Sequence, residues 1–239
     1  MEGVACEAAS LAGHLKLGKL ICLYDSNDVT LDGPASLSFS EDVSQRYTSY
    51  GWHTITVDDG NHDLEAIDRA IASAKAEVHK PSLIIVKTTI GYGSPNKAGK
   101  SAAHGSPLGA QEIELTKKAL GLNPTEKFTI ADDARAHFRQ ASTLGQKAKD
   151  AWHKQFASYE LAHPELAGDL QRVMAGKLPE NLFEDLPTFA AGSLIETRSS
   201  AGQVLNHLAK RMPELMGGDA DLGGSTKTVI QDGGSFNGQ

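Results

Sequence analysis

The chain has 239 residues, of which 40% are hydrophobic and 22% are charged, as in an ordinary folded globular protein. Its 23 basic and 30 acidic residues give a net charge of −7, and without a basic run the sequence argues against a nucleic-acid or anionic-membrane partner. Neither a signal peptide nor a membrane-length apolar run is found, so a cytoplasmic location is expected. The two cysteines, Cys6 and Cys22, lie in apolar stretches and are typical of core residues in a reducing compartment.

The first part of the chain has the alternating pattern of a parallel α/β fold. In chain order it predicts helix, strand, helix, strand, helix and strand at residues 2–15, 20–24, 41–50, 52–57, 64–74 and 83–86. Asp63 is placed to cap the third of these helices. The run Leu83–Val86 is apolar on both faces, which predicts a central strand of a parallel sheet.

Oxygen-bearing side chains follow the first predicted strand. In open α/β sheets, ligands bind beyond the carboxyl ends of the strands. Asn27 offers a neutral amide oxygen there, and Val29 offers a backbone carbonyl. Both are the hard oxygen ligands that Mg²⁺ prefers. The sequence therefore predicts a metal site at this position, although a carboxylate is still missing from the set.

A second candidate segment follows the strand at 83–86. Residues 90–100 predict a glycine-rich loop that leads to His104-Gly105-Ser106-Pro107. Asn96 stands where the dinucleotide fingerprint requires its third glycine, which excludes a nicotinamide dehydrogenase. Taken alone, His104 is more often a surface or core histidine than a site residue.

The rest of the chain predicts more helix than strand. The expected elements are a helix at 111–118, an extended segment at 127–130, helices at 134–160 and 165–174, a helix entrance at 197–200 and a short strand at 215–222. By itself Arg198 is either a solvated or capping arginine or a planar fork for phosphate. Asp221 by itself is a turn aspartate in most proteins.

A series of ordered motifs strongly resembles the transketolases, which are thiamine diphosphate-dependent enzymes. The matching stretches are 1–15, Tyr24-Asp25-Ser26-Asn27, 88–94, 103–108, Thr197-Arg198 and 217–222. The resemblance implies an α/β, parallel-sheet thiamine diphosphate-binding fold. Residues 1–160 would be the C-terminal part of the diphosphate domain, 161–190 a helical connector, and 191–239 the start of the pyrimidine domain. Met1 would then be internal, and the chain would come from about the middle of a longer polypeptide.

The resemblance also implies an activity. Transketolases move a two-carbon ketol unit from a ketose phosphate to an aldose phosphate in the pentose phosphate pathway. They use thiamine diphosphate with Mg²⁺, Ca²⁺ or another divalent cation, in a homodimer whose active sites lie at the subunit interface. The matching positions imply cofactor contacts at Glu2, Asn27, Leu31, Ile90, His104 and Asp221, metal ligation by Asn27 and Val29, and substrate binding by His104, Arg198 and Ser225, with His104 also catalytic.

Two alternatives stay open at this point. Another thiamine diphosphate enzyme, of the dihydroxyacetone synthase or deoxyxylulose-phosphate synthase type, shares the metal motif. The chain could instead be a non-catalytic binding or assembly module. Because the family's metal-binding aspartate would precede Met1 and its activating glutamate would follow Gln239, we expect this piece alone to be inactive.

Overall fold

The structure is a computed structural model that describes residues 3–237, and the chain forms two compact units. The first unit runs to Thr129 and takes in the C-terminal residues from Phe236, and the second is Ile130–Ser235. The first unit contains α1 (Ala5–His14), β1 (Ile21–Ser26), η1 (Ala35–Leu37), α2 (Val43–Ser49), β2 (His53–Val57), α3 (Leu64–Ala76), β3 (Ser82–Lys87), η2 (Ser101–Ala103) and α4 (Ala110–Ala119). The second contains α5 (Asp132–Ala162), α6 (Pro164–Met174), α7 (Thr197–Ala209) and α8 (Gly223–Thr226).

The first unit is built on a parallel sheet of three strands in the order β1-β3-β2. Ile21 of β1 and His53 of β2 both lie opposite Ser82, so the two outer strands start at the same level of the central one. Every residue of β3 from Ser82 to Val86 is buried. The prediction of a central parallel strand at 83–86 is therefore confirmed, as is the α/β class.

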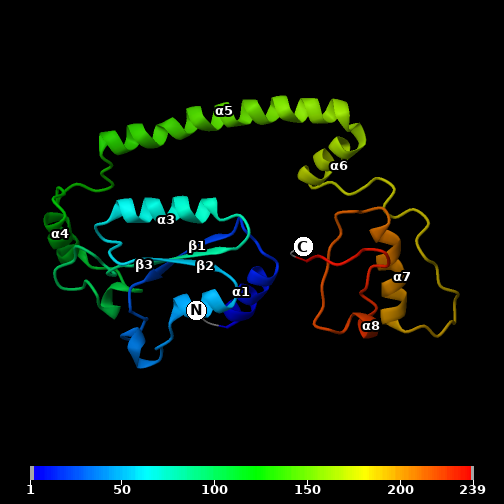
Figure 1. The fold of residues 1–239 in the computed structure, drawn as a ribbon, viewed down its shortest axis with the longest axis horizontal. Coiled ribbons are helices and arrows are strands. Elements are labelled where there is room, and N and C mark those ends of the chain that lie inside the picture. Colours follow the sequence, from blue (N-terminus) through cyan, green and yellow to red (C-terminus); the bar gives the residue numbers. More distant parts are fainter. Residues whose placement is uncertain (1–2, 238–239) are drawn as a thin grey trace. The chain divides into compact units, whose positions relative to one another are not determined.

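Helices cover both faces of this sheet (Figure 1). Leu83 and Ile85 point to one face, where they pack in a cluster with residues of α1 and α2. Ile84 and Val86 point to the other face, against α3. Successive side chains of a strand alternate between faces, so one short apolar run supplies both halves of the core.

The contact between α1 and the end of α2 is unusually close. The indole Nε1 of Trp52 donates a hydrogen bond to the Ala9 carbonyl at 2.8 Å. A Cβ on Gly13 would lie only 1.8 Å from the carbonyl oxygen of Tyr50. A glycine is therefore required at position 13 by the approach of the two backbones, because any side chain would collide with Tyr50.

The helix starts follow the capping chemistry in the sequence. The carboxylate of Asp63 accepts a hydrogen bond from the Ala66 backbone N–H at 2.8 Å, as predicted for the start of α3. Asp42 does the same for α2, where it accepts from the Gln45 N–H at 2.9 Å. These caps satisfy backbone donors that have no partner within the helix.

The second unit is helical in its regular structure. Its longest element, α5, has 31 residues and no buried side chain, and it packs against α6, where Ala167 is fully buried. Arg172 of α6 donates to both carboxylate oxygens of Glu214, at 2.6 and 3.0 Å. Within residues 3–237, the structure contains no helix that is both long enough and apolar enough to cross a membrane.

Two predicted extended segments are wrong. Residues 127–130 form no strand, and Phe128 adopts a φ of 55° with its side chain 98% exposed. Residues 215–222 also form no strand, and Asp221 has a φ of 64°. Within the described part of the chain neither segment pairs with a strand, so neither has the ladder of hydrogen bonds that holds a strand.

Candidate active site

The carboxyl ends of the three strands lie at one edge of the sheet because the strands are parallel. Asp25–Asn27 lies at the end of β1, Thr88–Ile90 follows β3, and Asp59–His62 follows β2. In open α/β folds this edge is where ligands bind. The sequence-predicted residues of the first unit therefore belong to an edge suited to a cofactor.

Asn27 is held by hydrogen bonds within its own turn. Its amide Nδ2 donates to the Asp25 carboxylate at 3.0 Å, and its Oδ1 accepts from the Val29 backbone N–H at 3.1 Å. The hydroxyl of Thr88 donates to the other carboxylate oxygen of Asp25, which ties the end of β1 to the end of β3. Asp25 was not among the predicted site residues. Its position at the strand end, two residues before Asn27, could have identified it from the sequence.

The oxygen atoms at this turn suit part of a magnesium site. An amide oxygen has two lone pairs, so the Asn27 Oδ1 can bind a cation while it accepts from Val29. The neighbouring carbonyl and carboxylate oxygens, of Val29 and Asp25, are also hard ligands. No group of three or more His, Cys, Asp or Glu side chains that could hold a metal occurs in residues 3–237. The oxygen donors of Asn27, Val29 and Asp25 would fit part of the shell of a Mg²⁺ whose other ligands are phosphate and further oxygens.

Leu31 and the residue that follows His104 lie next to each other, although they are far apart in the sequence. A Cβ added to Gly105 would lie 3.1 Å from a terminal methyl group of Leu31, so the residue after His104 contacts the loop after β1. His104 follows η2 and is exposed, as is Leu31 at 65%. This contact between the two loops leaves an imidazole and an apolar side chain open to a ligand.

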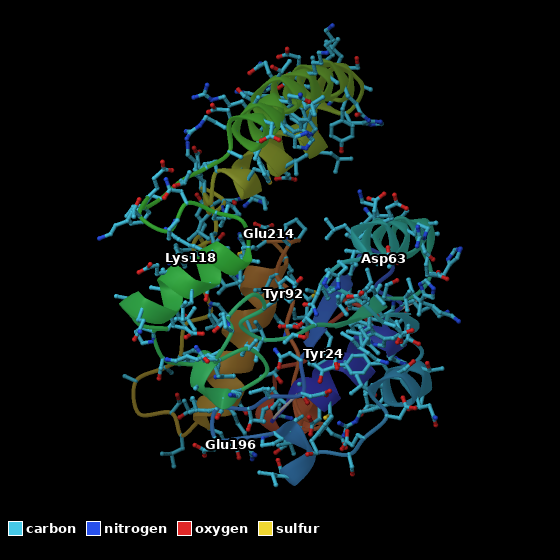
Figure 2. All side chains as sticks on the ribbon, turned by 90° about the vertical axis from the view of Figure 1, so that its left-hand side faces the viewer. Tyr24, Asp63, Tyr92, Lys118, Glu196 and Glu214 are labelled. Carbon is cyan, nitrogen blue, oxygen red and sulfur yellow. The ribbon has the colours of Figure 1, made fainter. Side chains whose placement is uncertain are left out.

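The loop that carries Ile90 is fastened to the turn between β2 and α3. Asn61 and Thr89 exchange two hydrogen bonds, Nδ2 to Oγ1 and backbone N–H to Oδ1, both at 3.1 Å. The Nε2 of His62 lies 2.8 Å from the hydroxyl of Tyr92, which Figure 2 labels. These contacts flank Ile90 on both sides, so the partly buried Ile90 has a defined position.

Glu112 of α4 anchors the next part of the same loop. Its buried carboxylate accepts hydrogen bonds from the Ser94 hydroxyl and from the backbone N–H and side-chain amide of Asn96, the last two at 2.9 Å each. The bond from Ser94, then those from Asn96, lower the pKa of Glu112 to about 2. The carboxylate is thus ionised at neutral pH. Sequence reasoning missed Glu112 because its partners lie far from it in the chain.

In the second unit, Arg198 lies in the first turn of α7 and is paired with Glu196. Its Nε and Nη2 donate to the two carboxylate oxygens of Glu196 at 2.9 and 2.8 Å. The pair raises the pKa of Arg198 and lowers the pKa of Glu196. A guanidinium presented in this planar fork is suited to bind carboxylate or phosphate.

Ser225 and Asp221 lie at and before α8, which packs on α7. A Cβ on Gly202 of α7 would lie 2.6 Å from the carbonyl oxygen of Lys227, so the two backbones are in close contact. A cavity of about 710 Å³ lies between these elements and is bordered by Ser199 and Gly224, the neighbours of Arg198 and Ser225. The second unit thus places the residues predicted to bind phosphate on two packed helices.

The predicted site residues fall into three groups. Asn27, Val29, Leu31, Ile90 and His104 lie at the carboxyl edge of the sheet in the first unit; Arg198, Asp221 and Ser225 lie on and between α7 and α8 in the second unit; Glu2 lies outside the described residues.

Comparison with known proteins gives one family. The family model for "Transketolase, thiamine diphosphate binding domain" matches residues 1–179. The transketolase of Geobacillus stearothermophilus is 54% identical over 237 residues, which are 99% of this chain and 35% of that protein. The transketolase of Bacillus subtilis is 48% identical over 99% of this chain and 35% of its own length. The chain therefore spans about a third of the length of these relatives.

The solved structures that resemble this chain are also transketolases. A transketolase from Pichia stipitis, in complex with sedoheptulose 7-phosphate, superposes with a TM-score of 0.91 at 42% identity, over 97% of this chain and 34% of that one. A transketolase from Leishmania mexicana gives a TM-score of 0.92 at 42% identity, over 98% of this chain and 34% of that one.

Proposed function

The chain belongs to the transketolase family, and from this premise we propose that a transketolase containing this sequence transfers a two-carbon ketol unit from a ketose phosphate to an aldose phosphate. The matched domain is the one that binds thiamine diphosphate. From the resemblance of its motifs we expected the chain to come from about the middle of a longer polypeptide. The family model assigns residues 1–179 to the N-terminal domain of the transketolases.

One observation carries the proposal. The turn after β1, the loop after β3 and the segment around His104 meet at the carboxyl edge of a parallel sheet, through Asp25–Thr88 and Leu31–Gly105. These are the segments that match transketolase motifs. Separate motifs that are joined by direct contacts support a single cofactor site rather than scattered surface features.

The first unit would hold the cofactor. We assign metal ligation to the side chain of Asn27 and the carbonyl of Val29, with Asp25 orienting Asn27 through the hydrogen bond at 3.0 Å. Leu31 and Ile90 would offer apolar contacts to thiamine diphosphate, and the family pattern adds Glu2 and Asp221 to its contacts. Bound thiamine diphosphate supplies the carbanion chemistry of ketol transfer, while the protein positions it.

His104 and the phosphate-binding pair would handle the substrate. The exposed imidazole of His104 can hydrogen-bond to an anionic oxygen or a sugar hydroxyl. Arg198 and Ser225 would bind the phosphate of the sugar, which is far from the reacting carbon. Such remote binding energy can be used to orient the reacting part of the substrate.

The remaining features of the proposal concern the whole protein. We propose a homodimer with active sites at the subunit interface, a role in the pentose phosphate pathway, and a cytoplasmic location without nucleic-acid or membrane partners. The domain boundaries at 160 and 190 stay predictions: a diphosphate domain, a helical connector and the start of a pyrimidine domain.

A direct assay tests the activity. A transketolase containing this sequence, given thiamine diphosphate and Mg²⁺, should transfer the ketol unit from xylulose 5-phosphate to an aldose phosphate, and chelation of the metal should abolish turnover. Transfer from xylulose 5-phosphate only to acceptors other than aldose phosphates would favour the dihydroxyacetone synthase type, and activity only with a donor other than a ketose phosphate would favour the deoxyxylulose-phosphate synthase type. Cofactor binding without any turnover would favour a binding module.

A further inference from the structure

Glu196 presents its two carboxylate oxygens to one edge of the Arg198 guanidinium. The contacts run from Nε and Nη2, at 2.9 and 2.8 Å. A phosphate monoester offers the same arrangement of two oxygens to a guanidinium fork. We propose that Glu196 competes with the sugar phosphate for Arg198 and so sets how strongly the enzyme prefers phosphorylated substrates. This inference rests on the role proposed above for Arg198.

Glu196 is held in place by more than Arg198. It is the residue before α7, and its backbone carbonyl accepts from the N–H groups of Ser199 and Ser200 at 2.9 and 3.1 Å. Its carboxylate also accepts from the Ser199 hydroxyl at 3.2 Å. The carboxylate is therefore pre-positioned beside Arg198, because the turn that starts the helix fixes its backbone.

The pair is also accessible to a competing anion. The side chains of Arg198 and Glu196 are 49% and 58% exposed, and Figure 2 labels Glu196. The positive charge of Lys227 acts on Glu196 in addition to that of Arg198. An incoming phosphate thus meets a guanidinium whose charge is already balanced, and to form two hydrogen bonds at the Nε–Nη2 edge it must displace the carboxylate.

The size of the effect follows from the exposure of the pair. Exposed ion pairs contribute little net free energy, so removing Glu196 should improve phosphate binding only about two- to fivefold. Salt screens the interaction between exposed charges, so the improvement should shrink as ionic strength rises.

The experiment compares Glu196→Gln with the unchanged transketolase at low salt, using ribose 5-phosphate and ribose as acceptors. Glutamine keeps the size of the side chain and removes its charge. The KM for ribose 5-phosphate should fall about two- to fivefold, with kcat and the KM for ribose unchanged. Inorganic phosphate should become a better competitive inhibitor by the same factor. Glu180→Gln removes another exposed carboxylate of the second unit and should change neither the KM for ribose 5-phosphate nor the inhibition by inorganic phosphate.

Arg198→Ala separates this inference from the proposed function. If Arg198→Ala weakens ribose 5-phosphate and ribose equally, both the phosphate role of Arg198 and the competition are overturned. If Arg198→Ala is selective for the phosphorylated acceptor but Glu196→Gln leaves its KM unchanged, only the competition is overturned. In the double variant, the Glu196 change should have no further effect, because the guanidinium for which it competes is gone.

Discussion

Asn27 keeps its orientation through the amide bond to Asp25 and the turn closed by the Val29 N–H. Replacing Asn27 by Leu removes the candidate metal ligand and both bonds. We expect metal-dependent binding of thiamine diphosphate to weaken at least tenfold, about 1.4 kcal/mol, in a titration of the transketolase with cofactor and Mg²⁺.

Asn123 provides a matched control for this prediction. Its Oδ1 also closes a turn, by accepting from the Thr125 N–H at 3.1 Å, but it lies in the loop after α4. Asn123→Leu therefore removes a similar turn and should leave cofactor affinity unchanged. Equal affinities for the Asn27→Leu variant and the unchanged enzyme would remove Asn27 from the metal site.

Glu112 links stability to pH. Its pKa is lowered from 4.5 to about 2 in the folded chain, so its contribution is fully present above about pH 4.5 and is lost as the pH falls to about 2. Urea unfolding at several pH values should show this loss, and Glu112→Gln should flatten the pH dependence over that range. The variant should also be less stable at pH 7, because Ser94 and Asn96 lose an ionised acceptor.

Glu114 tests whether any glutamate of α4 has this effect. It lies on the same helix and pairs with Lys118 on an exposed face. Glu114→Gln should therefore retain most of the acid-dependent loss of stability. If the Glu112 and Glu114 variants gave the same pH profile, the loop anchor at Glu112 would lose its support.

At the scale of elements, the approach of α1 to the end of α2 leaves no room for a side chain at Gly13. We expect Gly13→Ala to destabilise the chain by about 1–3 kcal/mol, because the helices must move apart. Thermal unfolding followed by circular dichroism measures this change. Gly145→Ala is the control: it lies in α5 with open space around it, so alanine should be neutral or stabilising. A neutral Gly13→Ala would mean that the two helices do not pack this closely.

The elements of the first unit could be predicted because their signals are local. A strand that is apolar on both faces, at 83–86, and an aspartate that caps a helix, Asp63, are each recognisable within a few residues. The extended segment expected at 127–130 and the strand expected at 215–222 are wrong because a strand also needs a neighbouring strand, and the nearby residues do not show whether one is present.

The residues of the candidate site also divide into those that the sequence could predict and those that it could not. Asn27 and His104 could be selected because they stand in motifs that resemble a known family. The contact between Leu31 and Gly105, and the anchoring of Ser94 and Asn96 by Glu112, depend on packing between distant segments. No pattern in the neighbouring sequence reports such contacts, so they could be found only in the folded structure.

At the scale of the whole molecule, the chain spans about a third of the length of its curated relatives. We predict that the 239-residue chain alone does not catalyse ketol transfer. It also exposes large apolar side chains, among them Phe138 at 78% and Trp152 at 52%, so it should bind a hydrophobic dye and aggregate more readily than a full transketolase.

Complementation checks this prediction. The purified chain is assayed with saturating thiamine diphosphate and Mg²⁺, first alone and then with the missing parts of a transketolase supplied as separate polypeptides. Turnover only in the second case is the expected result. Turnover by the chain alone would contradict it and would mean that these residues hold a complete catalytic centre.

The strand order β1-β3-β2 also constrains how the sheet can assemble during synthesis. The central strand is the last of the three to leave the ribosome, and β1 and β2 each pair with β3. Until Ser82–Lys87 has emerged, both outer strands lack the partner they have in the folded sheet. The nascent chain must therefore carry β1 unpaired for about sixty residues of elongation and β2 for about thirty, which at about 5–20 residues per second lasts several seconds. Because an unpaired strand edge can pair with another chain, β1 is the strand whose edges stay open to such pairing for the longest part of synthesis.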